Sequence, residues 1–466
     1  MESPNLGIFS SMTPQARAET IAVRLSALEL HPVTKILRQI FGLQSGAASE
    51  LYHVGGSVRD ALLAKPISDL DFSCALAPAE ILARLNALNV RALEMSAKHG
   101  TIIAVFSGVS YEITQFRDAA RTCAGDLALR DFTINALAFP VVSNLSQAQL
   151  YDPQAGLHDL ENSILRACGN DATARFTEDP LRILRAIRFG PAQNFELQAD
   201  TAAAATANAK LLLRISPERI RDELEKILLS ANPRAAFRVL RDLKVLDVIL
   251  PEVLPSIGSE QNEWHVEDVF EHTLTVISRA NLERIQRWCA LFHDLGKPAT
   301  TTVDEQGRRH FFGHEKVSET LAQQVMQRLR FSTDDQRLIS LLVRQHMRPI
   351  NLGEAGVRRL LRDLGAAYQE WRAFKWADAP PALDEALVKL ELAAFDKMVE
   401  TEFLRPKGSV YSALAVDGNM LVALGFAPGP KLGGALKMLH EVVLEDPEKN
   451  ERTILLNLAR EILKGP

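Results

Sequence analysis

Hydrophobic and polar residues follow different periods in different parts of the chain. Residues 1–50 combine a polar leader with two segments whose apolar residues recur at helical spacing, ETIAVRLSALEL and HPVTKILRQIFGLQ. Over residues 51–140 the pattern changes to short apolar runs typical of strands, LYHVGG, DLDFSCAL, TIIAVFSGV and YEITQF. Helical segments around residues 58–63 and at ILARLNAL interrupt these runs. The pattern therefore predicts a small domain that mixes helices and strands.

From about residue 151 onward the sequence predicts helix after helix and no further strand. Stretches such as DTAAAATANAKLLL and SPERIRDELEKILL favour helices, and the turn-rich LPEVLPSIGSE separates them from a histidine-rich helical region. The predicted fold class is α+β, with a mixed head on a long helical body. The expected domains are a helical extension at 1–50, the head at 51–150, a neck and body at 151–258, a histidine-rich domain at 259–380 and a helical C-terminal region at 381–466.

Length and composition indicate a multidomain globular protein. A chain of 466 residues is too long for one compact core, and 47% hydrophobic with 24% charged residues excludes a disordered or fibrous chain. The net charge of −5 excludes a uniformly basic nucleic-acid coat, so any RNA must contact local patches. Four scattered cysteines and the lack of an apolar run of about 18 residues predict a cytoplasmic protein without a membrane span.

The run HVGGSVRDALLAKPISDLDF places a strand, a glycine pair, a short helix and a second strand in succession. Gly55 and Gly56 allow the backbone to approach a phosphate closely, while the first N–H groups of the helix and the guanidinium of Arg59 supply positive charge. A glycine pair between a strand and a helix is also a common simple turn. The run therefore indicates a phosphate site only if other chemistry lies beside it.

Asp69 and Asp71 supply such chemistry. They lie two residues apart on a predicted strand, so their side chains share one face and can hold one or two Mg²⁺ ions. Two such ions would polarise an attacking hydroxyl and stabilise a leaving pyrophosphate. Glu112 in YEITQF is the candidate third carboxylate. The alternative is a solvated strand edge, but Leu70 and Phe72 flank the pair, and carboxylates among apolar neighbours cost stability unless a cation is present.

A further polar set, Arg130, Asp131 and Asn135, interrupts the apolar segment LALRDFTINALAF. In order along the chain, GGSVRDALL with DLDF, RDFTINALA and TEDPLRILRAIRF resemble the motifs of the class II tRNA nucleotidyltransferases. That family contains CCA-adding enzymes and bacterial poly(A) polymerases and belongs to the DNA-polymerase-β superfamily. The resemblance implies a polymerase-β-like head in which Asp69 and Asp71 hold the metals, Arg130 contacts the triphosphate, and Asp131 and Asn135 face the ribose.

The resemblance also implies that the third motif recognises the incoming base. Asp179 and Arg182 would lie at a helix start and offer hydrogen bonds to the edge of CTP or ATP, so that protein replaces a nucleic-acid template. Arg185 and Arg188 follow at three-residue spacing, and they either turn toward phosphates or form a solvated basic face. The implied activity is addition of CMP, with or without the terminal AMP, to the 3′ end of a tRNA.

The segment between Arg117 and Arg130 departs from the family pattern. Only DAARTCAGDLAL separates these residues, where the family usually has a long flexible loop, and Leu129 replaces the first arginine of an Arg-Arg-Asp triplet. Members that add only the two cytidines resemble this arrangement, because the loop is associated with the change from CTP to ATP. Addition of CC alone therefore stands beside addition of CCA, although loops also tolerate deletion without a change in function.

Histidines gather in the region that follows residue 259. They are His265, His272, His293, His310, His314 and His346. The segments VFEHTLTVI, ALFHDLGKP, FFGHEKVS and VRQHMRP resemble, in order, an HD-type metal phosphohydrolase domain. Imidazoles and carboxylates on facing helices hold a divalent transition metal that activates water for attack on a phosphoester. The implied metal ligands are His272, His293, Asp294 and Asp378. His314 and His346 would serve a second metal or the substrate phosphate.

Two rival functions follow from the same residues. A bacterial poly(A) polymerase shares the head motifs. Alternatively, the HD domain is the working enzyme, a metal phosphohydrolase, and the head is an RNA-binding platform; the intact pair Asp69 and Asp71 argues against this second rival. We expect an Mg²⁺-dependent enzyme whose partners are a tRNA 3′ end and CTP, with or without ATP, and no membrane.

Overall fold

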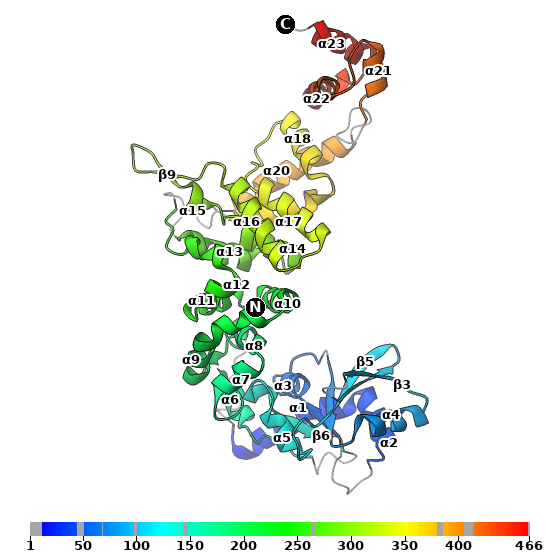
Figure 1. Ribbon diagram of the computed structural model, residues 1–466, viewed down its shortest axis with the longest axis vertical. Helices are drawn as coiled ribbons and strands as arrows, with labels where there is room; N and C mark the ends of the chain where they lie inside the picture. The colour runs from blue at the N-terminus through cyan, green and yellow to red at the C-terminus, as the bar shows by residue number, and fades with distance from the viewer. Residues whose placement is uncertain are drawn as a thin grey trace. The chain divides into compact units, whose positions relative to one another are not determined.

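The computed structural model describes residues 12–43, 51–67, 69–96, 100–142, 148–261, 267–379, 385–404 and 413–464. The chain divides into two compact units, Met1–Pro251 and Glu252–Pro466 (Figure 1). His265 lies outside the described residues. In the described part of the chain, no helix has both the length and the hydropathy needed to cross a bilayer.

The first unit contains a six-stranded sheet in the order β3-β4-β5-β2-β1-β6. Neighbouring strands are antiparallel except for β2 and β5, which are parallel. The strands are β1 (Leu51–Val54), β2 (Asp71–Cys74), β3 (Arg91–Ser96), β4 (Thr101–Phe106), β5 (Val109–Gln115) and β6 (Ala138–Pro140). Helices α3 (Gly56–Leu62) and α4 (Pro78–Ala87) interrupt them. The predicted strands and the predicted helical interruptions are confirmed.

Strand β2 begins at Asp71, which corrects the prediction that Asp69 and Asp71 share a strand face. The antiparallel register pairs Asp71 with Val54, the last residue of β1. β1 ends there because the chain turns into α3 at Gly55, whose φ of +74° only glycine adopts at low cost. Asp69 therefore lies beyond the last β1–β2 pair, with an exposed side chain in the loop before β2, whereas Asp71 is half-buried.

Helices α1 (Pro14–Leu30) and α2 (Pro32–Ile40) confirm the predicted helical segments that precede the sheet. The buried carboxylate of Glu29 on α1 accepts a hydrogen bond from Arg38 on α2, and it lies 3.4 Å from Nε2 of the fully buried His53 on β1. Burial lowers the pKa of His53, which the neighbouring Glu29 only partly offsets. The Glu29–Arg38 ion pair therefore joins the two N-terminal helices to each other, and Glu29 also contacts the sheet through the buried His53.

We expect Arg38→Ala to destabilise the first unit by about 3 kcal/mol, because it leaves the buried Glu29 carboxylate without its cation. The matched control is Glu80→Ala, which removes an exposed pair with Arg84 on α4 and should cost at most about 0.5 kcal/mol. Urea denaturation followed by circular dichroism measures both values. Equal shifts for the two variants would show that the Glu29 pair contributes no more than a surface pair.

The remainder of the first unit is helical. Its helices are α5 (Cys123–Ala128), α6 (Gly156–Glu161), α7 (Ala172–Glu178), α8 (Leu181–Phe189), α9 (Ala199–Asn208), α10 (Pro217–Leu228), α11 (Pro233–Asp242) and α12 (Leu246–Ile249). One two-residue parallel ladder joins β7 (Ile164–Leu165) to β8 (Glu196–Leu197). The expectation of no strand after residue 151 is wrong here, because a strand of two residues leaves no alternating pattern to detect.

The second unit is also built from helices. They are α13 (Val269–Arg279), α14 (Arg284–Phe292), α15 (Lys297–Thr300), α16 (His314–Arg328), α17 (Thr333–Gln345), α18 (Glu354–Leu364), α19 (Tyr368–Ala377), α20 (Glu385–Leu404), α21 (Gly418–Ala423), α22 (Pro430–Glu445) and α23 (Arg452–Lys464). A short hairpin of β9 (Thr302–Val303) and β10 (Arg309–His310) follows α15. The last three helices share their own hydrophobic core.

Candidate functional site

Asp71 on β2 and Glu112 on β5 are partners in the parallel register, and both line a cavity of about 350 Å³ together with Arg117 and Arg130. Burial raises the pKa of Asp71; the charges of Glu112 and Asp69 raise it further, whereas Arg130 lowers it. Carboxylates that destabilise one another's charge form a donor set that suits hard divalent cations. The three predicted carboxylates thus lie in one region of the head, although Asp69 does not line the cavity.

Arg130 lies against the glycine pair. A Cβ atom added at Gly55 would be 2.6 Å from Nη1 of Arg130. Nη2 of Arg130 lies 3.3 Å from a carboxylate oxygen of Asp126, but the buried Nε has no hydrogen-bond partner among the described residues. A buried N–H without an acceptor costs about 1–3 kcal/mol. The guanidinium is therefore suited to an anionic oxygen brought in by a ligand.

We expect Gly55→Ala to lower nucleotide addition by about tenfold or more, because the methyl group would displace the Arg130 guanidinium. The left-handed backbone adds about 1–2 kcal/mol of strain. Gly56→Ala is the matched control, since its Cβ would have only an ordinary contact of 3.6 Å with Arg59. Steady-state rates and melting temperatures separate the two effects. An unchanged rate in Gly55→Ala would show that Arg130 does not need this close approach.

A chain of hydrogen bonds connects four predicted residues that come from three motifs. Nη1 of Arg59 donates to Oδ1 of Asn135 at 2.6 Å, and Nδ2 of Asn135 donates to Oδ1 of Asp131 at 3.1 Å. Nε and Nη2 of Arg185 donate to Oδ2 of Asp131 at 2.9 and 2.6 Å. The fold therefore brings α3, the turn after α5 and α8 together through these side chains.

Asp131 and Asn135 are buried, with 8% and 5% of their surface exposed, and neither lines the cavity beside Asp71. Burial opposes ionisation of Asp131, but Arg185 and the hydrogen bond from Asn135 lower its pKa overall. Both carboxylate oxygens are engaged. Asp131 is therefore an ionised residue that holds Asn135 and Arg185 in place.

The third motif, TEDPLRILRAIRF, lies at the junction of α7 and α8. Asp179 ends α7, and its carboxylate accepts from the backbone N–H of Leu181 and lies 3.3 Å from Arg219. Arg182 donates to Glu178 and to the carbonyl of Leu129 at 3.0 and 3.2 Å. Arg182 thus connects the motif to the segment that precedes Arg130.

Arg185 and Arg188 are not part of a solvated basic face, which was one of the two expected alternatives. Arg185 pairs with the buried Asp131, and Arg188 pairs with the buried Glu223 on α10 at 2.7 Å. Both guanidiniums, with that of Arg59, also lie within 4.0–5.2 Å of the centre of the Phe189 ring. These arginines fix α8 against its neighbours.

Sequence reasoning missed the acidic residues that position the motifs. Asp126 is fully buried and pairs with Arg117 at 2.7 Å as well as with Arg130. Asp159 on α6 accepts a hydrogen bond, at 2.7 Å, from the hydroxyl of Thr133 in the segment RDFTINALA. The only signal for Asp126 was its spacing of four residues from Arg130. For Asp159 the local sequence carries no signal, because its partner comes from a distant segment.

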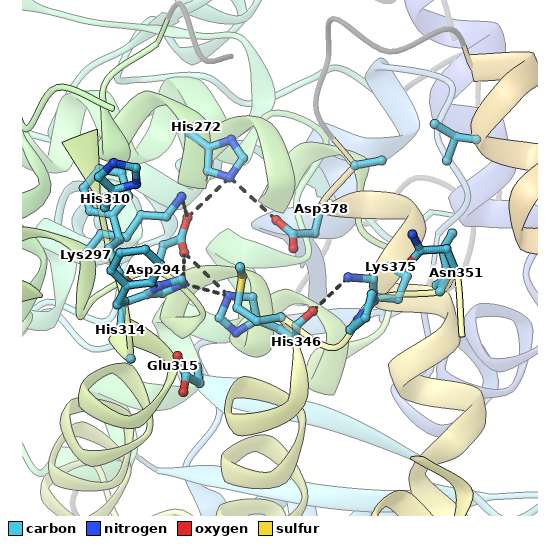
Figure 2. A pocket seen from close by; sticks show the side chains of 18 of the residues that line it. His272, Asp294, Lys297, His310, His314, Glu315, His346, Asn351, Lys375 and Asp378 are labelled. Atoms are coloured by element: carbon cyan, nitrogen blue, oxygen red, sulfur yellow. Dashed lines mark hydrogen bonds and ion pairs between the residues drawn. The ribbon is translucent and has the colours of Figure 1, made fainter. Parts of the chain in front are cut away.

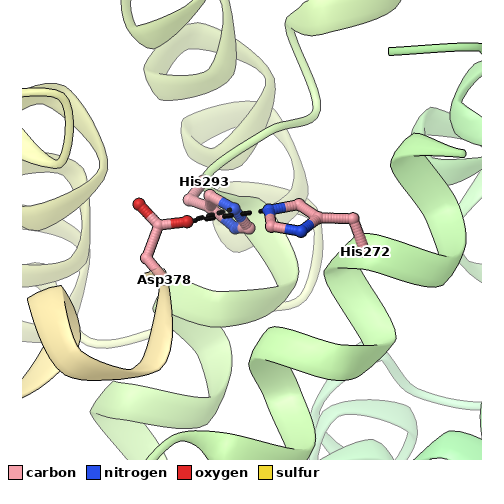
Figure 3. Close-up of side chains that lie close together, drawn as sticks. All are labelled: His272, His293 and Asp378. Atoms are coloured by element: carbon pink, nitrogen blue, oxygen red, sulfur yellow. Dashed lines mark ion pairs between the residues drawn. The ribbon is translucent and has the colours of Figure 1, made fainter. Parts of the chain in front are cut away.

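The second unit contains a cluster of histidines and aspartates at its centre. His272, His293 and Asp378 point toward one another (Figure 3), and their ligand atoms lie within 4.8 Å of one another. Asp294, His314 and His346 form a second such group (Figure 2). Five of the six residues, all but His293, line a cavity of about 740 Å³. The four implied ligands thus fall into two groups, and the two additional histidines complete the second.

Asp294 stands between the two groups. Its Oδ2 lies 3.4 Å from Nε2 of His272 and 3.1 Å from Nε2 of His293. Its Oδ1 lies 3.2 Å from Nε2 of His314 and 3.7 Å from Nε2 of His346. A carboxylate with one oxygen toward each group has the geometry to bridge two metal ions.

The imidazoles are oriented for metal binding. Nδ1 of His293, His314 and His346 lies 2.7–2.8 Å from a backbone carbonyl three residues earlier, so each Nδ1 carries a proton that it donates. The Nε2 atoms then face the cluster, where a bound metal ion would replace any proton that they carry. Nε2 of His314 and Nε2 of His346 are only 3.1 Å apart, a separation that requires a proton or a cation between them. The donor set therefore fits a divalent metal.

The positive charges of His293 and Lys297 balance the negative charges of Asp294 and Asp378 within the cluster. Burial lowers the pKa of His293, but Asp294 and Asp378 overcome this and raise it to about 10. Burial likewise opposes ionisation of Asp294, yet His293 and Lys297 hold its pKa well below the usual range. The aspartates are therefore ionised at neutral pH, as metal ligands must be.

Three protein families match consecutive parts of the chain. The Poly A polymerase head domain matches residues 51–166, the probable RNA and SrmB-binding site of polymerase A matches residues 194–256, and the HD domain matches residues 269–390. The first match contains the cavity beside Asp71, and the third contains the histidine cluster through Asp378. Divalent-metal chemistry is typical of the head and HD families.

Whole-chain relatives agree with these matches. A CCA-adding enzyme of Pediococcus pentosaceus is 30% identical over 439 residues, 90% of this chain and 95% of that protein. An A-adding tRNA nucleotidyltransferase of Deinococcus radiodurans is 30% identical over 403 residues, 83% and 90% of the two chains. The crystal structure of the Bacillus stearothermophilus CCA-adding enzyme, with CTP, has a TM-score of 0.63, 24% identity and coverage of 94% and 100%, which confirms the fold class. The chain belongs to the tRNA nucleotidyltransferase family, as its motifs predict.

Proposed function

We propose that this chain transfers CMP from CTP to the 3′ end of a tRNA, in a two-metal reaction carried by Asp69, Asp71 and Glu112. The observation that supports this most is the in-register pair of Asp71 and Glu112 beside Arg130, whose buried Nε has no partner among the described residues. The relatives named as CCA-adding and A-adding enzymes support tRNA as the acceptor. Neither a poly(A) polymerase nor a head without catalysis is favoured.

The reaction joins the 3′-oxygen of the RNA to the α-phosphorus of the nucleotide and breaks the bond to pyrophosphate. Mg²⁺ ions, when bound, polarise the attacking hydroxyl and stabilise the leaving group. Asp69, Asp71 and Glu112 would hold these ions. Arg130 would hold the triphosphate beside the backbone N–H of Gly56, because the N–H of Gly55 already donates to the carbonyl of Leu137 at 3.2 Å. Residues of this chain thus supply both the anionic and the cationic parts of the site.

Residues of α3, of α8 and of the segment RDFTINALA would recognise the nucleotide. Arg59, Asp131, Asn135, Arg185 and Arg188 would build the frame of the nucleotide site through the network described above. Asp179 and Arg182 would offer hydrogen-bonding edges to the base. These roles give each of the three motifs a part in nucleotide binding.

The acceptor and the nucleotide are tested with a tRNA transcript that ends before CCA, offered CTP or ATP with Mg²⁺. A short hairpin of the same 3′ sequence is the control, because RNA is recognised mainly by its shape. The proposal expects cytidine addition to the tRNA and little to the hairpin. Long adenosine tracts on either RNA would instead identify a poly(A) polymerase and contradict the proposal.

One observation favours a second candidate, addition of the two cytidines alone. The segment between Arg117 and Arg130 is the short helix α5, capped by Thr122, and both flanking arginines pair with the same buried Asp126. Because Asp126 holds both ends of this segment, the segment cannot move as far as a long flexible loop could. The test offers ATP to a tRNA that already ends in CC; no AMP addition supports this candidate, and rapid AMP addition excludes it.

In the second unit we infer a metal-dependent phosphohydrolase site that holds a divalent transition metal through His272, His293, Asp294 and Asp378. The bridging position of Asp294 favours a second ion at His314 and His346. We assign residues 51–150 to the head, 151–258 to the neck and body, 259–380 to this HD domain and the flanking segments to helical extensions. The four cysteines form no disulfide with one another, which supports a cytoplasmic location.

A further inference from the structure

The cavity that contains the histidine cluster has two lysines with different partners. Nζ of Lys297 lies 2.7 Å from Asp294 and donates to Gln261 at 2.8 Å, so its charge is neutralised. Nζ of Lys375, on α19, donates to the backbone carbonyl of His346 at 2.9 Å. No carboxylate among the described residues forms an ion pair with Lys375 within 4.0 Å. Lys375 is therefore a cation of the cavity wall with donors left for an anion.

The opposite part of the cavity carries an exposed aromatic ring. Phe312 is 81% exposed and stacks on His310 with ring centres 5.3 Å apart and an interplanar angle of 7°. Asp304 fixes His310 through a contact of 2.9 Å to Nε2. Figure 2 shows His310 and Lys375 on opposite sides of the view, with Asp294 and His346 between them. The cavity thus offers a stacking surface, a metal cluster and a cation.

We propose that Lys375 holds the phosphate of the substrate at the metal cluster and that Phe312 stacks on its nucleobase. This assignment rests on the phosphohydrolase function inferred above and names the two residues that select a nucleoside phosphate over a simple phosphoester. A cavity of about 740 Å³ has room for a nucleotide. Aromatic rings bind nucleobases of any sequence by stacking, which suits the varied ends of RNA chains.

The ammonium of Lys375 would repel metal ions bound at the cluster. An anion that contacts both of them, such as a substrate phosphate, removes this repulsion. The two metal groups contain only two carboxylates, Asp294 and Asp378, and one of them already pairs with Lys297. A phosphate with two charges would bring the cluster and Lys375 together in one network of charge-assisted hydrogen bonds. Lys375 is thus a positioning residue for the substrate, and the metal ligands remain the six side chains described above.

The test is a comparison of two variants with two ligands. Isothermal titration measures the affinity of the Mn²⁺-loaded protein for 2′-AMP and for inorganic phosphate, and binding that persists in His293→Asn is subtracted. Lys375→Met is expected to weaken both ligands at least tenfold, with Lys375→Arg retaining most of the affinity. Phe312→Ala is expected to weaken 2′-AMP about tenfold and leave phosphate unchanged, with Phe312→Tyr as its control.

Metal content, measured by mass spectrometry, separates positioning of the phosphate from support of His346. Lys375→Met with full metal content and weakened phosphate binding supports the assignment; lost metal or unchanged phosphate affinity overturns it. Phe312→Ala that weakens both ligands equally, or neither, overturns the stacking role. A wild-type protein that binds 2′-AMP through Lys375 but hydrolyses no phosphoester leaves this assignment standing and contradicts the phosphohydrolase function instead.

Discussion

Asp71→Asn is expected to lower CMP addition to tRNA by at least about 10³-fold. Loss of a metal-binding carboxylate removes several kcal/mol of transition-state stabilisation, and each 1.36 kcal/mol corresponds to about a factor of ten in rate. Asparagine keeps the shape of the side chain, so the strand register with Val54 and Glu112 should persist. Primer-extension gels with radiolabelled CTP measure the rate over the required range.

Stability should move in the opposite direction from activity. The pKa of Asp71 is higher in the folded protein than in the unfolded chain, so its ionisation above the unfolded pKa opposes folding at neutral pH. The neutral asparagine removes this cost, and the melting temperature should be unchanged or higher. Phosphate binding by the HD domain should also be unchanged. Full CMP addition by a stable variant would show that Asp71 does not hold a catalytic metal.

Asp294→Asn is expected to remove both metal ions from the HD domain and to lower its phosphohydrolase activity by at least about 10³-fold, since each group uses one oxygen of this carboxylate. His272→Asn and His346→Asn each alter one group, and each should lose one ion. Metal content after dialysis, measured by mass spectrometry, gives the stoichiometry. Nucleotide addition by the head should continue in all three variants.

The number of metal ions that Asp294→Asn retains decides whether Asp294 bridges the two groups. If Asp294→Asn keeps one ion per chain, the carboxylate serves a single group and does not bridge. Removal of the buried carboxylate also leaves Lys297 without its ion pair, so a modest loss of stability is expected in this variant and not in His272→Asn. Comparison with the histidine variants therefore separates a lost ligand from a weakened fold.

Local sequence predicted the elements that carry the head well. Glu112 was placed on a strand, and the register puts it opposite Asp71. Asp69 was placed on a strand and is not, because β1 ends at Val54, opposite Asp71, and Asp69 lies beyond that pair. That difference depends on Gly55, whose backbone conformation ends β1. The residues next to a glycine do not predict which conformation it adopts.

Long-range contacts were the part that the sequence could not supply. The motifs named Asp131 and Arg185 separately, but their ion pair joins segments 54 residues apart. The same is true of the HD domain, where His293 and Asp294 were expected to act as one set; in space Asp294 contacts His293 with one carboxylate oxygen and joins His314 and His346 with the other. Such groupings depend on how helices pack, which periodicity within one helix does not encode.

Sequencing of tRNA 3′ ends tests nucleotide transfer to tRNA most directly. A tRNA that lacks CCA is incubated with the protein and with CTP and ATP together before it is sequenced. The wild-type protein is expected to give ends that gain two cytidines, with or without a terminal adenosine, and Asp71→Asn is expected to lose this extension. Ends that remain unextended, or that gain runs of adenosine, would contradict the proposed function.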